Sequence, residues 1–259
     1  MNYYRPPRFS LFPPAVKNLL IANVLFFIAT LVLQNTFQFD LTNTLGLHYF
    51  LSHDFKPYQG ITYMFMHGGF MHIFFNMFAL WMFGNMLENY WGSKRFLLFY
   101  FICGIGAALT QEVTQYIYFH GIENALNIYN AAPNMNDFSL LVQKYFTGFQ
   151  YPQPASTGES VEILQKLYQL RMDMSVTIGA SGAIFGVLLA FGMLFPDTML
   201  YVFFAIPIKA KYFVIIYGLI ELYSAMAANT SDNVAHFAHL GGMVFGFFLI
   251  QYWKHKRTL

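Results

Sequence analysis

The stretch Val176–Phe195, VTIGASGAIFGVLLAFGMLF, decides the class of fold. It carries no charged side chain, and it is as long as a helix must be to cross the hydrocarbon core of a bilayer, which takes about 20 apolar residues. Near its beginning the stretch holds Gly179-Ala180-Ser181-Gly182. A polar side chain is costly inside a membrane helix, so Ser181 is a candidate for function.

The composition of the whole chain also indicates a membrane protein. Charged residues make up 10% of the 259 residues, and the mean hydropathy is +0.44, whereas soluble domains contain about 25% charged residues. So few charges cannot cover a water-soluble surface. The net charge of +2 gives no reason to expect a nucleic-acid partner. The single cysteine, Cys103, excludes an internal disulfide and a metal site built from cysteines.

Six apolar segments are candidate spans, so we expect an all-α, polytopic membrane protein with a bundle of six transmembrane helices. The segments are Val16–Gln34, Phe70–Tyr90, Phe96–Tyr118, Val176–Phe195, Tyr212–Ala227 and Val234–Trp253. The apolar run Met199–Ile208 contains a proline and adjoins lysines, so we interpret it as a loop that dips into the membrane interface. The polar connection at 119–175 is expected to be a long outer loop, with an amphipathic helix near Val161–Met172.

The distribution of basic residues predicts the orientation. With six spans both ends share a side, and that side carries most of the basic residues: Arg5, Arg8, Lys17, Lys94, Arg95, Lys209, Lys211, Lys254, Lys256 and Arg257. We therefore expect a cytoplasmic segment at 1–15, a six-helix domain at 16–253 and a basic cytoplasmic tail at 254–259. The expected location is the cytoplasmic (inner) membrane of a bacterium.

Polar residues within the apolar segments gather at the outer ends of the second, fourth and sixth spans. Besides Ser181 they are His67, His72, Asn76, His236 and His239. At a rise of 1.5 Å per residue, Ser181 and His239 each lie roughly 7 Å inside their segments. Because the fourth and sixth spans run in the same direction, the two side chains are expected at matching depth.

Small residues predict that the fourth and sixth spans pack closely. The two stripes are Gly182, Gly186 and Ala190 on the fourth span, and Ala238, Gly242 and Gly246 on the sixth. Such stripes allow two membrane helices to approach each other. If the stripes face each other, the Ser181 hydroxyl and the His239 imidazole can come within hydrogen-bonding distance.

This pairing indicates nucleophilic catalysis. A histidine beside a serine can accept its proton during attack and return that proton to the leaving amine. Acyl transfer also needs hydrogen-bond donors at the developing oxyanion, and the candidates are the Ser181 backbone N–H, His72 and Asn76. Phe185 lies one turn after Ser181 and is expected to pack against the His239 ring.

These features also have structural interpretations. A serine in a membrane helix more often bonds to its own helix, and a histidine near the interface usually bonds to a carbonyl or water. Glu221, the only acid well inside a helix, is either functional or part of a buried hydrogen bond. Asp232, just before the sixth span, either orients a histidine or caps the helix.

A metal site is the main chemical alternative. It would be built from the histidines at one end: His67, His72, His236 and His239. There is no H-E-x-x-H motif, and in the sequence no carboxylate lies at ligand spacing beside these residues. We therefore expect no metal.

Three motifs resemble those of the rhomboid intramembrane serine proteases. They are Tyr58–Asn76 (YQGITYMFMHGGFMHIFFN), Gly179–Gly182 (GASG) and Ala238–Gly246 (AHLGGMVFG). The motifs occur in the family's order on alternate spans, and the resemblance covers about Val16–Trp253. Three departures stand out: Phe185 replaces a common tyrosine, the 35–69 loop lacks a Trp-Arg pair, and the connection at 119–175 is long.

The resemblance implies a six-helix bundle with a water-filled cavity that opens outward. It implies a dyad of Ser181 and His239 that requires no acid and no cofactor, with the oxyanion site described above. The residues expected to support the site are Gly179, Gly182, Phe185, His67 and His236. The implied partners are the lipid bilayer and single-span membrane proteins, cut near their outer ends; the oligomeric state stays open.

Two other functions remain alternatives. The first is a catalytically silent relative that binds and escorts membrane helices, although such a protein would be expected to lack the serine or the histidine. The second is a small transporter or channel, which would need polar residues distributed through the depth of the bundle. The sequence favours a protease because it keeps both residues and gathers its polar groups at one end.

Overall fold

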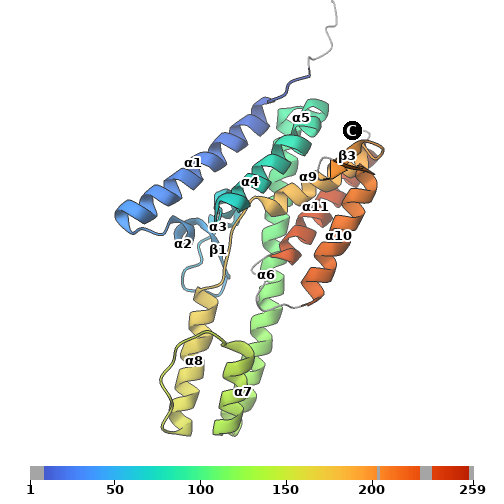
Figure 1. The fold of residues 1–259 in the computed structure, drawn as a ribbon. Helices are drawn as coiled ribbons and strands as arrows, with labels where there is room; N and C mark the ends of the chain where they lie inside the picture. The colour runs from blue at the N-terminus through green and yellow to red at the C-terminus, as the bar shows by residue number, and fades with distance from the viewer. Residues whose placement is uncertain (1–8, 203–204, 228–234, 257–259) are drawn as a thin grey trace, which may run out of the picture.

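The computed structural model describes residues 9–202, 205–227 and 235–256, and helices dominate these ranges (Figure 1). The longer helices are α1 (Pro14–Phe37), α4 (Phe70–Ala79), α5 (Asn85–Trp91), α6 (Ser93–Ala131), α7 (Met135–Tyr145), α8 (Thr157–Asp173), α9 (Ser181–Leu194), α10 (Ala210–Ala227) and α11 (His236–His255). The short helical elements are α2 (Leu41–Leu45), α3 (Gln59–Thr62), a 3₁₀ turn at Tyr63–Phe65 and a π-helical turn at Leu80–Gly84 that joins α4 to α5. Two antiparallel strand pairs complete the fold: β1 (Leu47–His48) with β2 (Val176–Thr177), and β3 (Met199–Val202) with β4 (Ile206–Lys209).

Four helices within the described residues are long and apolar enough to cross a membrane. They are Pro14–Phe37, Phe70–Trp91 (α4, the π-helical turn and α5 taken together), Ser93–Ala131 and Ala210–Ala227. They correspond to the first, second, third and fifth expected segments. The apolar helix α9 has 14 residues and is about 21 Å long, shorter than the hydrocarbon core of about 30 Å. Its expected start at Val176 is wrong, because the chain there pairs as strand β2 and the helix begins at Ser181.

The centre of the bundle is formed by α6, α9 and α11, and glycines let these helices touch. A Cβ added to Gly242 would overlap the carbonyl oxygen of Gly182, and one added to Gly246 would lie 3.4 Å from the Gly186 Cα. The prediction that the small-residue stripes of the fourth and sixth spans face each other is therefore confirmed. Helix α11 begins at His236, while Val234, its expected first residue, lies outside the described residues.

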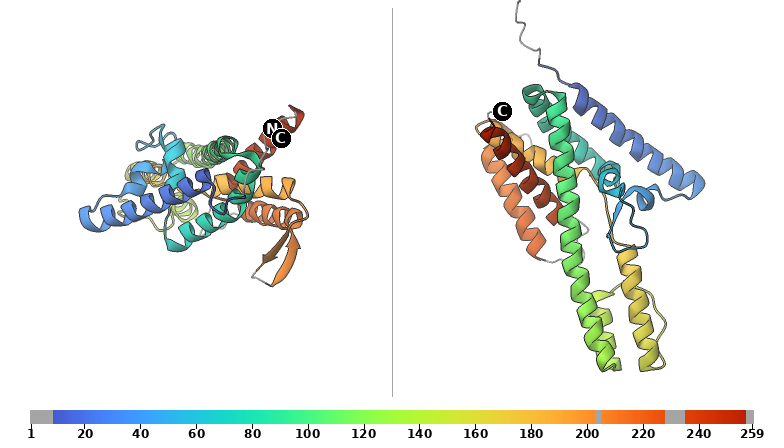
Figure 2. Two further views of the ribbon diagram at one scale, coloured as in Figure 1. Left: turned by 90° about the horizontal axis from the view of Figure 1, so that it is seen from above. Right: turned by 180° about the vertical axis from the view of Figure 1, so that it is seen from behind.

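Helix α6 extends far beyond the other helices of the bundle. Its 39 residues span about 58 Å, roughly twice the thickness of the hydrocarbon core. The C-terminal end of α6 lies beside α7 and α8, and together they form a helical projection (Figures 1 and 2). The expectation of a loop at 119–175 is therefore wrong for most of its length, although the amphipathic helix near Val161–Met172 is present within α8.

The projection is helical because it has an apolar core of its own. Buried side chains from its three helices pack together with Tyr49: Phe119, Ile122, Leu126, Tyr129, Phe138, Val142, Phe146, Ile163, Leu164, Leu167 and Met172. The side chains of Asn134 and Ser156 cap α7 and α8 by accepting from the backbone N–H groups of Asp137 and Glu159. These caps satisfy N–H groups that the first turn of a helix leaves free.

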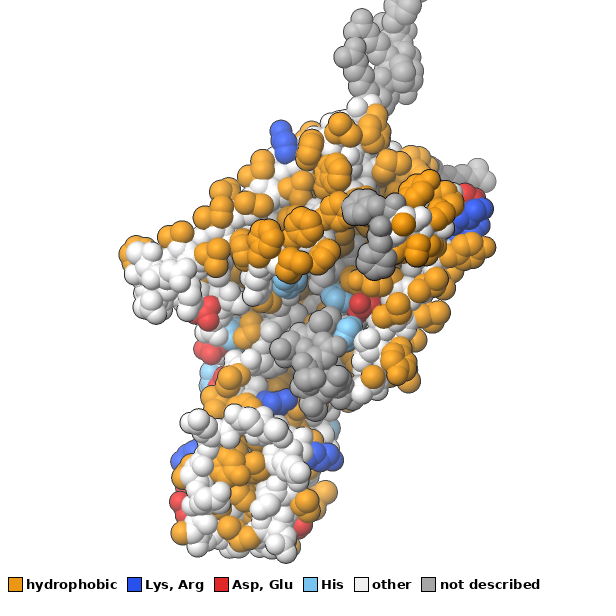
Figure 3. Space-filling model, viewed as in Figure 1, with side chains coloured by type: hydrophobic (Ala, Val, Ile, Leu, Met, Phe, Trp, Pro, Cys, Tyr) orange, Lys and Arg blue, Asp and Glu red, His pale blue; other side chains and the backbone are white. Residues whose placement is uncertain are grey.

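The surface divides into an apolar body and a polar projection. Figure 3 shows hydrophobic side chains over most of the upper body, whereas the lower projection presents many polar ones.

Helix α1 begins and α11 ends at the same end of the body, away from the projection (Figure 1). Lys209 and Lys211 each lie 3.0 Å from Asp197, beside the β3–β4 hairpin.

The segment Met199–Ile208 forms this hairpin, apart from 203–204, which lie outside the described residues. The expected loop is thus a paired hairpin, in which strand pairing satisfies backbone hydrogen-bonding groups, and its position at the membrane interface stays a prediction. The hairpin protrudes from the side of the bundle (Figure 2). Its exposed side chains include Met199, Tyr201 and Ile206.

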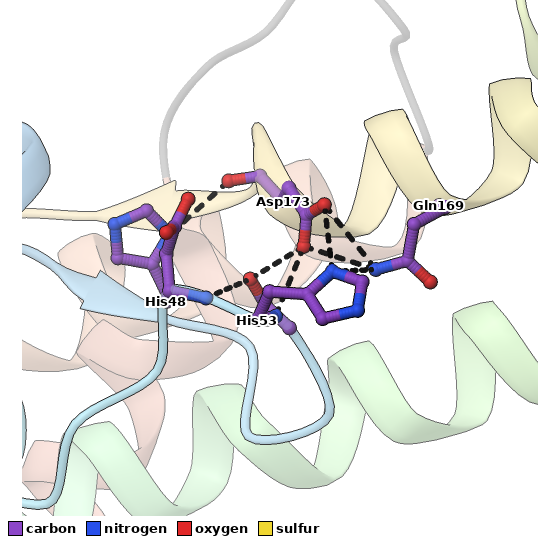
Figure 4. Close-up of polar contacts among 6 residues, drawn as sticks. His48, His53, Gln169 and Asp173 are labelled. Carbon is purple, nitrogen blue, oxygen red and sulfur yellow. Dashed lines mark hydrogen bonds and ion pairs between the residues drawn. The ribbon is translucent and has the colours of Figure 1, made fainter.

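A polar cluster fixes the base of the projection to the loop that follows β1 (Figure 4). Asp173, at the end of α8, accepts hydrogen bonds from the Ser52 hydroxyl at 2.8 Å and from the His53 backbone N–H at 3.1 Å. Gln169 donates to the same carboxylate, and His48 Nδ1 lies 3.1 Å from the Asp173 carbonyl oxygen. Burial acts to raise the pKa of Asp173, but these hydrogen bonds prevail and lower it below the usual 3.8.

Candidate active site

The Gly-Ala-Ser-Gly motif forms the turn that starts α9. Gly179 has a φ of 122°, which L side chains rarely adopt, and its N–H donates to the Tyr63 carbonyl at 2.9 Å. A Cβ at this position would lie 2.8 Å from Nε2 of His72, so glycine is also needed for space. The turn places Ser181 as the first residue of α9, beside the histidine of α4.

Ser181 and His239 are in direct contact. The Ser181 Oγ and His239 Nε2 atoms are 2.8 Å apart. Ser181 is the first residue of α9 and His239 the fourth of α11, so the two meet near the starts of their helices rather than five residues inside them. The ring of Phe185 stacks on the imidazole with centroids 4.2 Å apart and planes 8° apart, and Tyr217 stacks on Phe185. These contacts hold the imidazole with Nε2 toward the hydroxyl.

An acid contacts the other side of the imidazole. Oε2 of Glu221, on α10, lies 2.8 Å from His239 Nδ1 and 2.6 Å from His236 Nδ1. The sequence left Glu221 open between a functional acid and a structural one, and the resemblance implied that no acid is required. The signal in the sequence was a lone carboxylate inside an apolar helix. Asp232, the other acid considered, lies outside the described residues.

Two further polar side chains of α4 line the same cavity as Ser181. Nδ1 of His72 accepts a hydrogen bond from the Gly68 N–H at 3.3 Å, so the neutral ring carries its proton on Nε2, the atom nearest Gly179. Asn76 lies one turn further along α4 and is buried. Both side chains carry an N–H donor and line the cavity that Ser181 also lines.

The residues expected to support the site take different positions. His67 is buried behind His72, with ring centroids 5.0 Å apart. Burial, with a smaller effect from His72, lowers the pKa of His67 to about 4, so its ring is neutral at physiological pH. Gly182 lies in the contact between α9 and α11, and His236 contacts Glu221.

A cavity of about 1280 Å³ connects the serine to the projection. Its inner part is lined by apolar side chains that include Phe75, Phe83 and Leu188, and its outer part by polar ones that include Gln115 and Arg171. In Figure 3, histidine and acidic side chains are visible where the apolar body meets the projection. The cavity therefore extends from the packed helices of the apolar body to the base of the projection.

Glu221, His236 and His239 could also hold a metal ion, because their ligand atoms lie within 4.8 Å of one another. A carboxylate with two histidines is a ligand set that zinc enzymes use. The argument from sequence spacing did not find this group, because the acid comes from a different helix than the two histidines. The expectation that no metal is bound stays a prediction.

The fold and the site define an integral membrane protein built from packed apolar helices, with a cavity that contains polar side chains. A comparison with protein families matches the Rhomboid domain at residues 54–121 and 156–255. The chain belongs to the rhomboid family. The matched ranges leave out 122–155, which comprise the end of α6, all of α7 and the connection to α8. A search of curated proteins finds no match.

Proposed function

We propose that the protein is an intramembrane serine endopeptidase that cleaves membrane-spanning segments near the outer membrane face. The observation that carries this proposal is the 2.8 Å contact between Ser181 Oγ and His239 Nε2 at the cavity. Rhomboid proteins are generally intramembrane serine proteases, which supports the same activity. The proposed reaction requires no metal or other cofactor.

The proposed mechanism begins when Nε2 of His239 accepts the Ser181 proton as Oγ bonds to the scissile carbonyl carbon. The carbonyl oxygen then becomes an oxyanion, which accepts hydrogen bonds from the Ser181 backbone N–H, His72 and Asn76. The protonated His239 gives its proton to the leaving amine as the peptide bond breaks. Water then hydrolyses the acyl-enzyme, with the same histidine as general base.

The proposal also includes six membrane spans and cytoplasmic termini. The six spans are the four longer helices together with α9 and α11. Most residues of α9 are buried against other helices, so a short α9 does not have to match the full lipid thickness. The lysines near the start of α6 and in the β3–β4 region are expected on the cytoplasmic side. The substrates are single-span membrane proteins, and a bacterial inner membrane is the expected location.

The direct test is cleavage of a tagged single-span protein in membranes that contain this chain. Ser181→Ala and His239→Ala should each abolish cleavage, whereas Ser139→Ala and His120→Ala, at exposed positions of the projection, should not. A serine-directed fluorophosphonate should label the wild type and fail to label Ser181→Ala. Persistent cleavage by either of the first two variants would refute the dyad.

A non-catalytic escort protein is the alternative. It would bind the same single-span proteins, and neither Ser181→Ala nor His239→Ala would change their fate. An absence of fluorophosphonate labelling in a folded wild-type protein would favour this alternative.

A further inference from the structure

The carboxylate of Glu221 is buried beside the proposed dyad. Glu221 is 6% exposed, and one carboxylate oxygen, Oε2, contacts Nδ1 of both His239 and His236. A buried carboxylate is costly unless hydrogen bonds replace its lost hydration. The two imidazole N–H groups supply those hydrogen bonds, so the acid and the two histidines form one connected group.

The direction of proton transfer determines which ring nitrogen of His239 carries the proton before the reaction. If Nε2 of His239 is to accept the Ser181 proton, the ring proton of the neutral form must lie on Nδ1. The acceptor for that Nδ1–H is Glu221, at 2.8 Å. The carboxylate thus selects the tautomer in which Nε2 is free, and it stabilises the imidazolium that forms during attack.

We propose that Glu221 is a positioning residue, which acts through His239 and makes the site a Ser-His-Glu arrangement rather than an independent dyad. This inference rests on the proposed protease function. It also means that three helices contribute to proton transfer: the serine is on α9, the base on α11 and the acid on α10. His236 contacts the same carboxylate oxygen as His239 and helps to fix the position of the Glu221 carboxylate.

The same three residues could instead hold a metal ion, but their geometry favours hydrogen bonds. The two N–O distances of 2.6 and 2.8 Å are those of charge-assisted hydrogen bonds, whereas two ligand atoms held about 2.0–2.2 Å from one tetrahedral zinc ion would lie roughly 3.3–3.6 Å from each other. A zinc ion on His239 Nδ1 would replace the proton that the proposed mechanism keeps there. The two alternatives therefore predict different responses to a chelator.

The first arm of the test compares purified full-length Glu221→Ala and Glu221→Gln with the wild type in detergent or vesicles. Each variant should lower kcat for a single-span substrate by about 10- to 100-fold while KM changes by less than about twofold. The rate of fluorophosphonate labelling of Ser181 should fall in parallel. Sodium formate should restore part of the activity of Glu221→Ala, because a small carboxylate can occupy the space left by the side chain, and sodium chloride should not.

Glu88 offers a matched control. It is also a buried carboxylate, but it accepts hydrogen bonds from the backbone N–H groups of Ala15 and Val16 at the start of α1. Glu88→Gln should lower the thermal stability while kcat per folded molecule stays unchanged. If Glu221→Ala fails to fold, Glu221→Gln, which keeps the volume of the side chain, still reports kcat.

The outcomes separate the two proposals. If the wild type cleaves and Ser181→Ala does not, but both Glu221 variants keep the wild-type kcat, the role of Glu221 is overturned and the protease function stands. If the wild type neither cleaves nor reacts with the fluorophosphonate, the protease function itself fails. Loss of wild-type activity with EDTA and its recovery with zinc would overturn the hydrogen-bonded arrangement in favour of a metal site.

Discussion

The backbone at Gly179 determines where two side chains of the site can lie. Its positive φ turns the chain so that Ser181 starts α9, and its missing side chain leaves space for the His72 ring. The position therefore combines a conformational and a steric requirement. Gly69, in the loop before α4, has an extended φ of 168°, and an added Cβ there would have no atom of the described residues within 4 Å.

Gly179→Ala should therefore reduce cleavage strongly, whereas Gly69→Ala should remain close to the wild type. The alanine would incur backbone strain of about 1–3 kcal/mol and would displace the His72 ring from its place beside the serine. Steady-state cleavage and thermal unfolding of both variants check this expectation. Wild-type kcat in a folded Gly179→Ala protein would contradict the proposed position of His72 at the oxyanion.

At the residue scale, the sequence predicts the contact between Ser181 and His239 because both lie near the starts of helices whose small-residue stripes pack together. The assumed depth of five residues is wrong, since α9 begins only at Ser181. The role of Glu221 stays open in the sequence for a physical reason. Its contact depends on how α10 is rotated against α11, and the pattern of α10 alone does not specify that rotation.

At the scale of helices, the contact between α9 and α11 depends on the absence of side chains. Gly242 faces the backbone of Gly182, and backbone atoms cannot move aside as a flexible side chain can. Gly121, in the projecting part of α6, is exposed, and within the described part of the chain no atom lies within 4 Å of a Cβ added there. Alanine substitutions at Gly242 and Gly121 therefore distinguish the effect of close helix packing from the effect of helix propensity.

Gly242→Ala should destabilise the protein by about 1–3 kcal/mol or more, because the added methyl group forces the two helices apart. Gly121→Ala should instead be neutral or stabilise the protein by about 0.5–1 kcal/mol, since alanine is the better helix former. Unfolding in mixed detergent micelles measures both effects. Equal stability of the two variants would show that α9 and α11 do not approach each other as closely as described.

The contact between α8 and the loop after β1 has a pH dependence that follows from Asp173. Hydrogen bonds to its carboxylate lower the pKa in the folded state, so its ionised form stabilises this contact above the ordinary value of 3.8. The stabilisation should be lost as pH falls through the lowered pKa. The sequence did not predict this cluster, because Ser52 and Asp173 lie 121 residues apart.

Asp173→Asn should lower the thermal unfolding temperature near neutral pH. The difference from the wild type should shrink as pH falls below 3.8, where the wild-type carboxylate also becomes protonated. Unfolding curves of both proteins across this range provide the measurement. A difference that stayed constant in acid would mean that the ionised carboxylate is not what holds α8 to the loop.

At the scale of the whole molecule, an apolar body and a polar projection share one continuous helix, α6. The sequence predicts the apolar body well, because long uncharged segments have few alternatives to membrane helices. It predicts the projection poorly. The buried side chains there alternate with polar ones on three short helical stretches, so no single stretch shows that they meet in one core.

The proposed orientation leads to a prediction that tests the whole arrangement. If the termini are cytoplasmic, α7 lies outside the cell and the end of α11 lies inside. Gln143→Cys should then react with a membrane-impermeant maleimide on intact cells, and His255→Cys should react only after permeabilisation. Both positions are exposed, whereas the only native cysteine, Cys103, is fully buried, so the unmodified chain is the control for background labelling. The opposite pattern would place the cavity, which opens toward the projection, on the cytoplasmic side, and cleavage near the outer membrane face would then be impossible.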